Sequence, residues 1–166
     1  MKTTLQKILK NISCESQRKE FLRKLGKKES DNCKIEILEI LDLNGFDDAL
    51  WSLRGVDGYE RELRLFAVWC GRRVQENIKD QKSIDAINIA EKFANGEASE
   101  SDLLQVWVNA DDSLDGGWPA DKNAGRAAYT SAKWFAAIAQ SNKDERQAQE
   151  RQFREVLLNC RDACRA

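Results

Sequence analysis

The sequence predicts an all-α fold, a compact multi-helix bundle of about seven or eight helices, and three observations lead to this class. Apolar residues recur at steps of three and four along most of the chain, which is the spacing of one helix face. Strict alternation of apolar and polar residues, the pattern of a half-buried strand, is absent. The composition, with 42% hydrophobic residues, 33% charged residues and one proline, is typical of a folded helical globule.

The length of the chain sets the expected number of domains. A chain of 166 residues buries about two thirds of its unfolded surface and forms a core without disulfides or a structural metal. We expect a single all-helical domain over residues 1–166, with the basic helices of residues 1–28 as a candidate for a separate subdomain.

Capping and helix-ending residues divide the first half of the chain. Ser30–Asp31 precedes an expected helix that Asn44–Gly45 ends. Asp47 caps a short helix that ends before Gly55. The next helix is expected to be long, because one of its faces carries Leu63, Phe66, Ala67, Cys70, Val74 and Ile78.

Four further helices are expected in the second half, each starting at a capping residue. Their bounds are Ser83 to Asn95–Gly96, Ser99 or Ser101 through Ala110, Asp121 or Asn123 to Ser141–Asn142, and about Asp144 to the C-terminus. Two of them carry clear apolar faces, formed by Leu103, Val106, Trp107, Ala110 and Leu114 and by Phe153, Val156, Leu157, Cys160 and Cys164.

Residue types that common catalytic sites need are missing from the sequence. The chain has no histidine, which removes the commonest general base, the usual zinc ligand and every Ser-His or Cys-His nucleophile. Gly116–Gly117 is followed by Trp-Pro and not by the Lys-Ser/Thr of a phosphate-binding loop, and the five cysteines contain no Cys-x-x-Cys pair. We therefore expect a protein that is not an enzyme, with no catalytic residue, no bound metal and no cofactor.

The amino-terminal stretch "MKTTLQKILKNIS" lacks the apolar run of a signal peptide. No stretch of about 18 consecutive apolar residues occurs anywhere in the chain. The expected location is the reducing cytoplasm of a bacterial host cell, without membrane association.

Four stretches, "DDALWSLR", "RLFAVWCGRRV", "IDAINIAEKFANGEASESDLL" and "AGRAAYTSAKWFAAIA", resemble a group of small alanine-rich helical proteins of phages, prophages and bacteria. Some members of that group are described as immunity proteins. The resemblance covers about residues 5–140, and its best marker is the isoleucine-containing helix that ends in "ANGE" before "SESDLL". It implies a helical bundle carried by mobile elements and supplies no catalytic residues. This chain departs from the group at "DDSLDGGWPADKN", which interrupts the alanine-rich helices.

The stretch "DDSLDGGWPADKN" imitates the start of a helix-loop-helix calcium site, with oxygen ligands at alternate positions and glycine at the sixth. Lys122 occupies the twelfth position, where a bidentate glutamate should lie, so tight calcium binding is not expected. Two interpretations stay open. The stretch is either a glycine-proline hinge between helices or a recognition loop, in which a charged rim surrounds an aromatic anchor: Asp111, Asp112, Asp115, Trp118 and Asp121.

Charge is distributed in blocks along the chain. Residues 1–28 hold nine basic and two acidic side chains, residues 29–60 hold two basic and nine acidic ones, and residues 97–121 hold seven acids and no base. The basic block lacks a readout motif, so direct nucleic-acid binding is not expected. The second block predicts an additional acidic binding surface, formed by Glu36, Glu39, Asp42, Asp47 and Asp48.

The favoured functional interpretation is a non-enzymatic, protein-binding inhibitor from a phage or mobile element that blocks a bacterial defence protein. Rows of carboxylates can occupy a groove built for a phosphate backbone, which makes an anti-CRISPR-like block of a defence nuclease complex the expected mode. One alternative is an immunity protein that neutralises a cognate bacterial toxin. A second alternative is a carboxylate-based, metal-dependent hydrolase. Homo-oligomerisation is left open.

Overall fold

The computed structural model describes residues 1–31, 33–109, 119–121, 123–139 and 141–163. Within these ranges the chain forms nine α-helices, two short 3-10 helices and one two-stranded sheet. The predicted all-α class is confirmed. The described residues form nine α-helices against the expected seven or eight, and two of them, α1 (Leu5–Leu9) and α2 (Glu15–Leu25), lie in the basic segment 1–28.

The two strands are the main departure from the expected secondary structure. β1 (Lys2–Thr4) pairs antiparallel with β2 (Lys34–Glu36), with Thr3 opposite Ile35. The helix expected to follow Ser30–Asp31 therefore begins later, as α3 (Ile37–Asn44). Strands of three residues are too short to show alternation, and their pairing joins segments about 30 residues apart, so the local pattern carries no signal for them.

The middle of the chain follows the predicted division closely. Gly45 ends α3 with φ of +93°, a backbone conformation that glycine adopts readily, and α4 (Phe46–Ser52) starts directly after it. A 3-10 turn, η1 (Leu53–Gly55), leads to α5 (Glu60–Arg73) and then to a second one, η2 (Gln75–Asn77). All six apolar residues of the face predicted for the long helix are buried, although α5 itself ends before the last two of them.

The remaining helices are α6 (Gln81–Ala94), α7 (Glu100–Asn109), α8 (Ala124–Ile138) and α9 (Asn142–Ala163). Of the two residues predicted to start α8, Asp121 and Asn123, the cap is Asn123, since its side chain accepts a hydrogen bond from the Arg126 amide. At α6 the cap is Asp80, not Ser83. The Asp80 carboxylate accepts bonds from the hydroxyl and amide of Ser83, and these bonds lower the pKa of Asp80.

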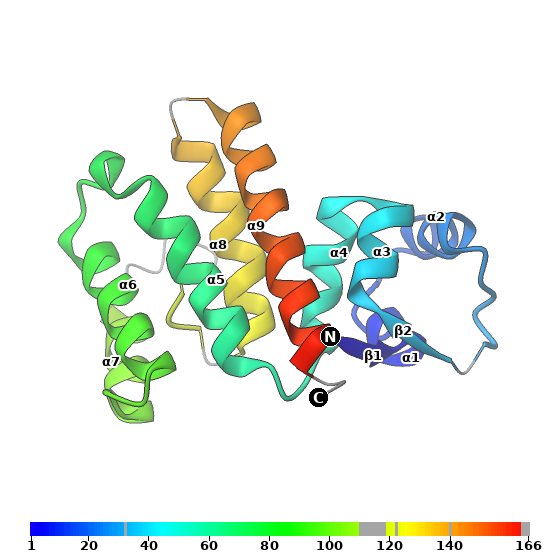
Figure 1. Ribbon diagram of the computed structural model, residues 1–166, viewed down its shortest axis with the longest axis horizontal. Coiled ribbons are helices and arrows are strands. Elements are labelled where there is room, and N and C mark those ends of the chain that lie inside the picture. The colour runs from blue at the N-terminus through cyan, green and yellow to red at the C-terminus, as the bar shows by residue number, and fades with distance from the viewer. Residues whose placement is uncertain (32, 110–118, 122, 140, 164–166) are drawn as a thin grey trace.

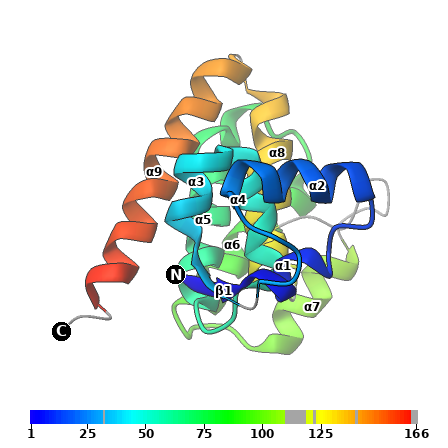
Figure 2. The same cartoon turned by 90° about the vertical axis from the view of Figure 1, so that its right-hand side faces the viewer.

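The long helices α5, α8 and α9 pack side by side in the middle of the molecule (Figure 1). Helices α6 and α7 pack beyond α5 at one end, whereas β1, β2 and α1–α3 form the other end. Figure 2 shows α9 running along one side of the molecule, and its packing against both α8 and α3 joins the two ends. None of the described helices is long and apolar enough to cross a membrane.

Small residues allow the central helices to approach closely. A Cβ atom added to Gly71 of α5 would lie 2.7 Å from Ile87 Cδ1 of α6 and 3.0 Å from Phe135 Cε2 of α8. A Cβ atom added to Gly125 of α8 would overlap the backbone carbonyl group of Leu53 in η1. The alanines of α8 that face the core, including Ala128 and Ala132, are fully buried. The close contact of α8 with α5 and η1 therefore requires residues without bulk.

We predict that Gly125→Ala lowers the free energy of unfolding by about 2 kcal/mol or more, because a backbone carbonyl cannot move aside as a flexible side chain can. This loss outweighs the advantage of about 1 kcal/mol that alanine normally has over glycine in a helix. Urea unfolding followed by circular dichroism measures it. The control is Ala137→Gly at an exposed position of the same helix, which should cost at most about 1 kcal/mol. A Gly125→Ala protein as stable as the wild type would contradict this packing.

Candidate functional sites

Four of the five residues predicted to form a recognition loop, Asp111, Asp112, Asp115 and Trp118, lie outside the described residues, as does Lys122. The fifth, Asp121, is described, and its side chain is buried at 3% exposure. Its carboxylate pairs with Arg126 at 3.0 Å and also accepts a bond from the Asn123 amide. The expectation of Asp121 on an exposed rim is thus corrected, because this carboxylate organises the start of α8 from the interior.

Arg64 of α5 holds the segment that precedes α8. This side chain is only 1% exposed, and its Nη1 atom donates to the backbone carbonyls of Pro119 at 2.6 Å and Asp121 at 2.8 Å. The guanidinium also lies over the Phe93 ring, 5.2 Å from its centroid. Burial lowers the pKa of Arg64, and the nearby charges of Asp121 and Glu60 oppose that shift. Arg64 therefore acts as a structural cation at the end of the acidic stretch.

The predicted second acidic surface is divided into two parts. Glu36, Glu39 and Asp42 line a shallow hollow of about 340 Å³ together with Leu38 and Leu43. Asp47 and Asp48 lie instead in a different depression, next to α2 and α8. The five carboxylates therefore do not form one continuous surface.

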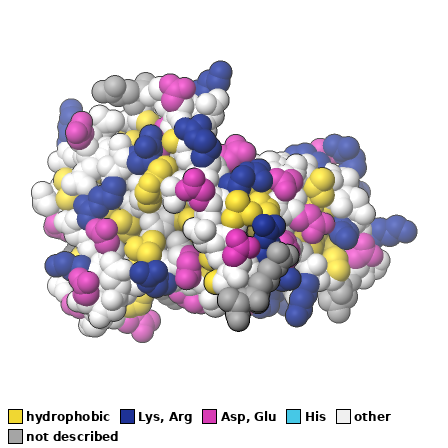
Figure 3. Space-filling view, viewed as in Figure 1, with side chains coloured by type: hydrophobic (Ala, Val, Ile, Leu, Met, Phe, Trp, Pro, Cys, Tyr) yellow, Lys and Arg dark blue, Asp and Glu magenta, His cyan; other side chains and the backbone are white. Residues whose placement is uncertain are grey.

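Basic side chains neutralise most of these carboxylates. Glu36 pairs with Lys2 at 3.2 Å, Asp42 with Arg154 at 2.6 Å, Asp47 with Arg146, and Asp48 with Lys24 at 3.5 Å. Glu39 is the member of the set that takes part in no ion pair within the described residues. Figure 3 shows the result, because acidic and basic side chains are interspersed over the face that it displays. Charges that are segregated along the sequence are thus mixed in space.

Helix α7 carries two of the large apolar residues that are exposed within the described part of the chain. Leu104 is 52% exposed and Val108 is 62% exposed, and they lie one helical turn apart, beside the half-buried Trp107. Glu100, in the first turn of α7, and Glu97, three residues before the helix, are exposed, and neither takes part in an ion pair within the described residues. These five residues are called the α7 surface below.

A pocket of about 430 Å³ adjoins the α7 surface. Its walls are largely apolar, and the buried Arg64 guanidinium lines it as well: Arg64, Phe93, Glu100, Ser101, Leu103, Leu104, Trp107 and Ala120. Asp102, in the first turn of α7, is engaged by the Ser99 hydroxyl and amide, which lower its pKa. Its carboxylate thus serves the helix start, whereas Glu97 and Glu100 face solvent.

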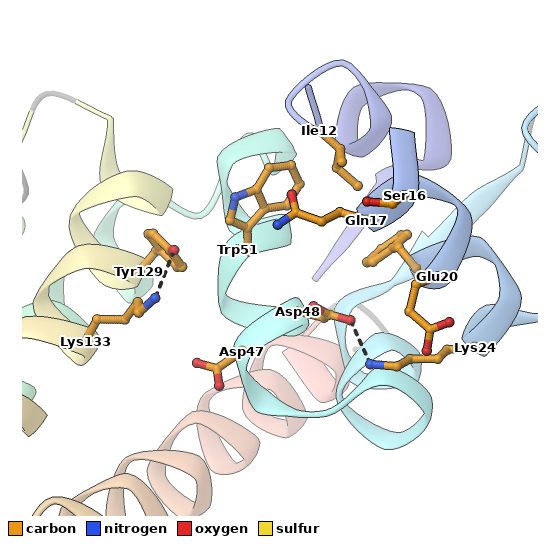
Figure 4. A pocket seen from close by; sticks show the side chains of 11 residues that line it. Ile12, Ser16, Gln17, Glu20, Lys24, Asp47, Asp48, Trp51, Tyr129 and Lys133 are labelled. Atoms are coloured by element: carbon orange, nitrogen blue, oxygen red, sulfur yellow. Dashed lines mark hydrogen bonds and ion pairs between the residues drawn. The ribbon is translucent and has the colours of Figure 1, made fainter. Parts of the chain in front are cut away.

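A larger depression of about 510 Å³, called the aromatic groove below, lies between α2, α4 and α8 (Figure 4). Eleven residues line it: Ile12, Ser16, Gln17, Glu20, Phe21, Lys24, Asp47, Asp48, Trp51, Tyr129 and Lys133. In Figure 4 the Gln17 amide reaches from α2 toward the Trp51 indole, and Tyr129 and Lys133 project from α8 on the opposite side. The groove thus combines aromatic side chains with charges of both signs.

Arg54 connects the aromatic residues of the groove. Its guanidinium carbon lies 5.6 Å from the centroid of the Trp51 ring and 4.7 Å from that of Tyr129. The Lys133 ammonium lies 5.4 Å from the Tyr129 centroid and donates to the Tyr129 hydroxyl at 3.4 Å. Two cations thus converge on one phenol ring.

The described cysteines differ in environment, but none has a disulfide partner among the described residues. Burial raises the pKa of the Cys70 thiol well above its ordinary value, so this residue is a neutral core group. Cys14 is exposed, and hydrogen bonds from Ser16 and the following backbone lower its pKa. Cys160 is buried, and Cys164 lies outside the described residues.

Comparison with protein-family models, with curated proteins and with solved structures finds no match to this chain. The functional proposals below therefore depend on the residues of this chain and on their arrangement.

We predict that Arg64→Met lowers the free energy of unfolding by about 2 kcal/mol, because it leaves the buried carbonyls of Pro119 and Asp121 without their donor. Thermal and urea unfolding measure the change. Arg61→Met is the matched control, since Arg61 is exposed on the same helix and bonds only to the Asn95 side chain among the described residues. Equal stabilities of the two variants would show that Arg64 does not hold this segment.

Proposed function

We propose that this chain is a non-enzymatic inhibitor that binds a bacterial protein through the α7 surface. The observation that supports it is the combination of an exposed apolar ridge, Leu104 and Val108, with solvent-facing carboxylates that have no ion-pair partner in the described part of the chain. Ridges of this kind, with a polar rim, are typical of protein-binding surfaces. A pocket beside the ridge can accept a side chain of the partner.

The charge of the α7 surface defines the kind of partner. Glu97 and Glu100 give this surface negative side chains without an ion-pair partner in the described part of the chain, and the stretch that follows α7 in the sequence adds aspartates but no lysine or arginine up to Asp121. A complementary partner surface carries lysine or arginine around an apolar side chain. Nucleic-acid-binding grooves have this composition, so the proposed partner is a defence nuclease complex, blocked in an anti-CRISPR-like manner.

Self-association through the exposed apolar residues is disfavoured by their surroundings. The large exposed hydrophobic residues within the described part of the chain are Leu43, Leu104 and Val108. Leu43 lies in the hollow lined by Glu36, Glu39 and Asp42, and the α7 surface carries Glu97 and Glu100. Contact between two α7 surfaces brings together carboxylates without ion pairs in the described part of the chain, and contact with the hollow adds Glu39, which favours a basic partner over a second copy.

We predict that Leu104→Ser combined with Val108→Ser reduces partner capture at least tenfold, because it removes the apolar anchors of the interface. A pull-down from the bacterial host with tagged protein measures capture, followed by identification of the captured proteins. Leu43→Ser is the matched control, because Leu43 and Leu104 have the same exposure of 52%. Capture that is equal for wild type, the double variant and the control would remove α7 from the proposal.

Charge is tested separately with Glu97→Gln combined with Glu100→Gln, which should weaken capture and flatten its dependence on salt. The activity of the captured protein is then assayed with and without this chain. Inhibition of a defence nuclease supports the proposal. Capture of a toxin encoded by an adjacent gene would instead favour the immunity function, and an unchanged activity would refute inhibition.

A further inference from the structure

We propose that the aromatic groove is a second binding site, which accepts an acidic segment of a protein in which a glutamate or aspartate neighbours an aromatic side chain. The groove is separate from the α7 surface, since the two share no residue. It therefore adds a contact that the proposed inhibitor function does not require.

The carboxylates of the aromatic groove are all engaged by cations. Arg23 binds Glu20 in a bidentate manner, with both nitrogen-to-oxygen distances at 2.7 Å, and this pairing lowers the pKa of Glu20. Asp47 pairs with Arg146, and Asp48 pairs with Lys24 at 3.5 Å. The negative charges that line the groove are consequently compensated by the protein itself.

Two cations near the groove have no such partner within the described residues. Lys133 lines the groove and contacts Tyr129, whereas Arg54 does not line it but lies against the rings of Trp51 and Tyr129. Arg54 Nε is also buried without a hydrogen-bond acceptor in the described part of the chain. Among the described residues that line the groove, the uncompensated charge is thus the Lys133 ammonium, which lies next to the Tyr129 ring. A carboxylate of a ligand would complete this arrangement.

The walls of the aromatic groove select the rest of the ligand. Trp51 and Tyr129 are half-buried, and Ile12 and Phe21 are buried beside them, so the groove offers apolar area to an aromatic or aliphatic side chain. The Gln17 amide, exposed at the edge near Trp51, can bond to a peptide backbone. A volume of about 510 Å³ holds two or three residues of an extended segment.

A nucleic acid fits the aromatic groove less well than an acidic peptide does. Aromatic rings and cations also bind single strands, but a continuous row of phosphates requires a groove of one sign. The cations that pair with Glu20, Asp47 and Asp48 are already engaged, so Lys133 is the lining cation left for phosphates in the described part of the chain. A single carboxylate on a peptide requires one such cation beside an aromatic ring, which Lys133 and Tyr129 provide. An acidic peptide is therefore the proposed occupant.

The test titrates a capped peptide, acetyl-Glu-Phe-Glu-Glu-amide, into the whole protein. Binding is measured from the side-chain NMR signal of the Trp51 indole, which is assigned with the Trp51→Phe variant. Addition of the peptide should shift that signal. Lys133→Ala should weaken binding about fivefold or more, whereas Lys133→Arg should retain it, since the cation is kept. The peptides Lys-Phe-Lys-Lys and Glu-Ala-Glu-Glu, capped in the same way, should bind at least fivefold more weakly.

The matched control is Lys143→Ala, because Lys143 is an exposed lysine outside the groove with no ion pair in the described part of the chain. It should bind like the wild type, as should the Leu104→Ser and Val108→Ser variant of the α7 surface. Equal binding by Lys133→Ala and Lys143→Ala would overturn the proposal. So would tighter, Lys133-dependent binding of a single-stranded oligonucleotide, or a Trp51 shift that appears on concentrating the protein alone, which would identify a second copy as the occupant.

Discussion

The close approach of α8 to α5 and η1 is the constraint on which the other parts of the structure depend. Gly125 allows the backbone of η1 to lie against the start of α8, and Gly71 gives room to Ile87 and Phe135 where α5, α6 and α8 meet. Bulk at either glycine would separate the helices that position both candidate sites. On one side, Tyr129 and Lys133 of α8 complete the aromatic groove. On the other side, α6 packs on α5, and α7 packs on α6.

Ion pairs between distant segments fix the amino-terminal elements to this central packing. Asp42 of α3 and Asp47 of α4 pair with Arg154 and Arg146 of α9, and the Arg146 guanidinium lies 4.4 Å from the centroid of the Phe46 ring. Exposed pairs of this kind contribute less than about 1 kcal/mol each to stability. Their larger consequence is for recognition, because they occupy carboxylates that the sequence alone presents as a free acidic surface.

The sequence predicts what depends on local pattern and misses what depends on distant contacts. The structure confirms three features that depend only on neighbouring residues in the sequence: the buried face of α5, the end of α3 at Gly45 and the Asn123 cap of α8. The β1–β2 pair is not predictable in this way, because each strand has three residues and its partner is far along the chain. The sequence around Arg64 suggests an ordinary surface charge. The side chain is nevertheless buried, because the carbonyls it binds come from a segment 55 residues away.

The aromatic groove could not be predicted for the same reason. Asp47 and Asp48 are foreseen from their acidic block, but nothing local indicates that Trp51 faces Tyr129 and Lys133.

The folded charge distribution leads to a different view of recognition from the one that the blocks in the sequence suggest. Pairing between blocks leaves Glu97 and Glu100 at the start of α7, and Arg54 and Lys133 beside the rings of the groove, without ion pairs in the described part of the chain. These two sites have opposite signs and use different helices. Electrostatic complementarity contributes more to specificity and to the rate of association than to affinity. A partner that presents a basic surface at one point and an acidic segment at another would therefore be bound in a single orientation, because reversing the chain would place like charges together at both sites.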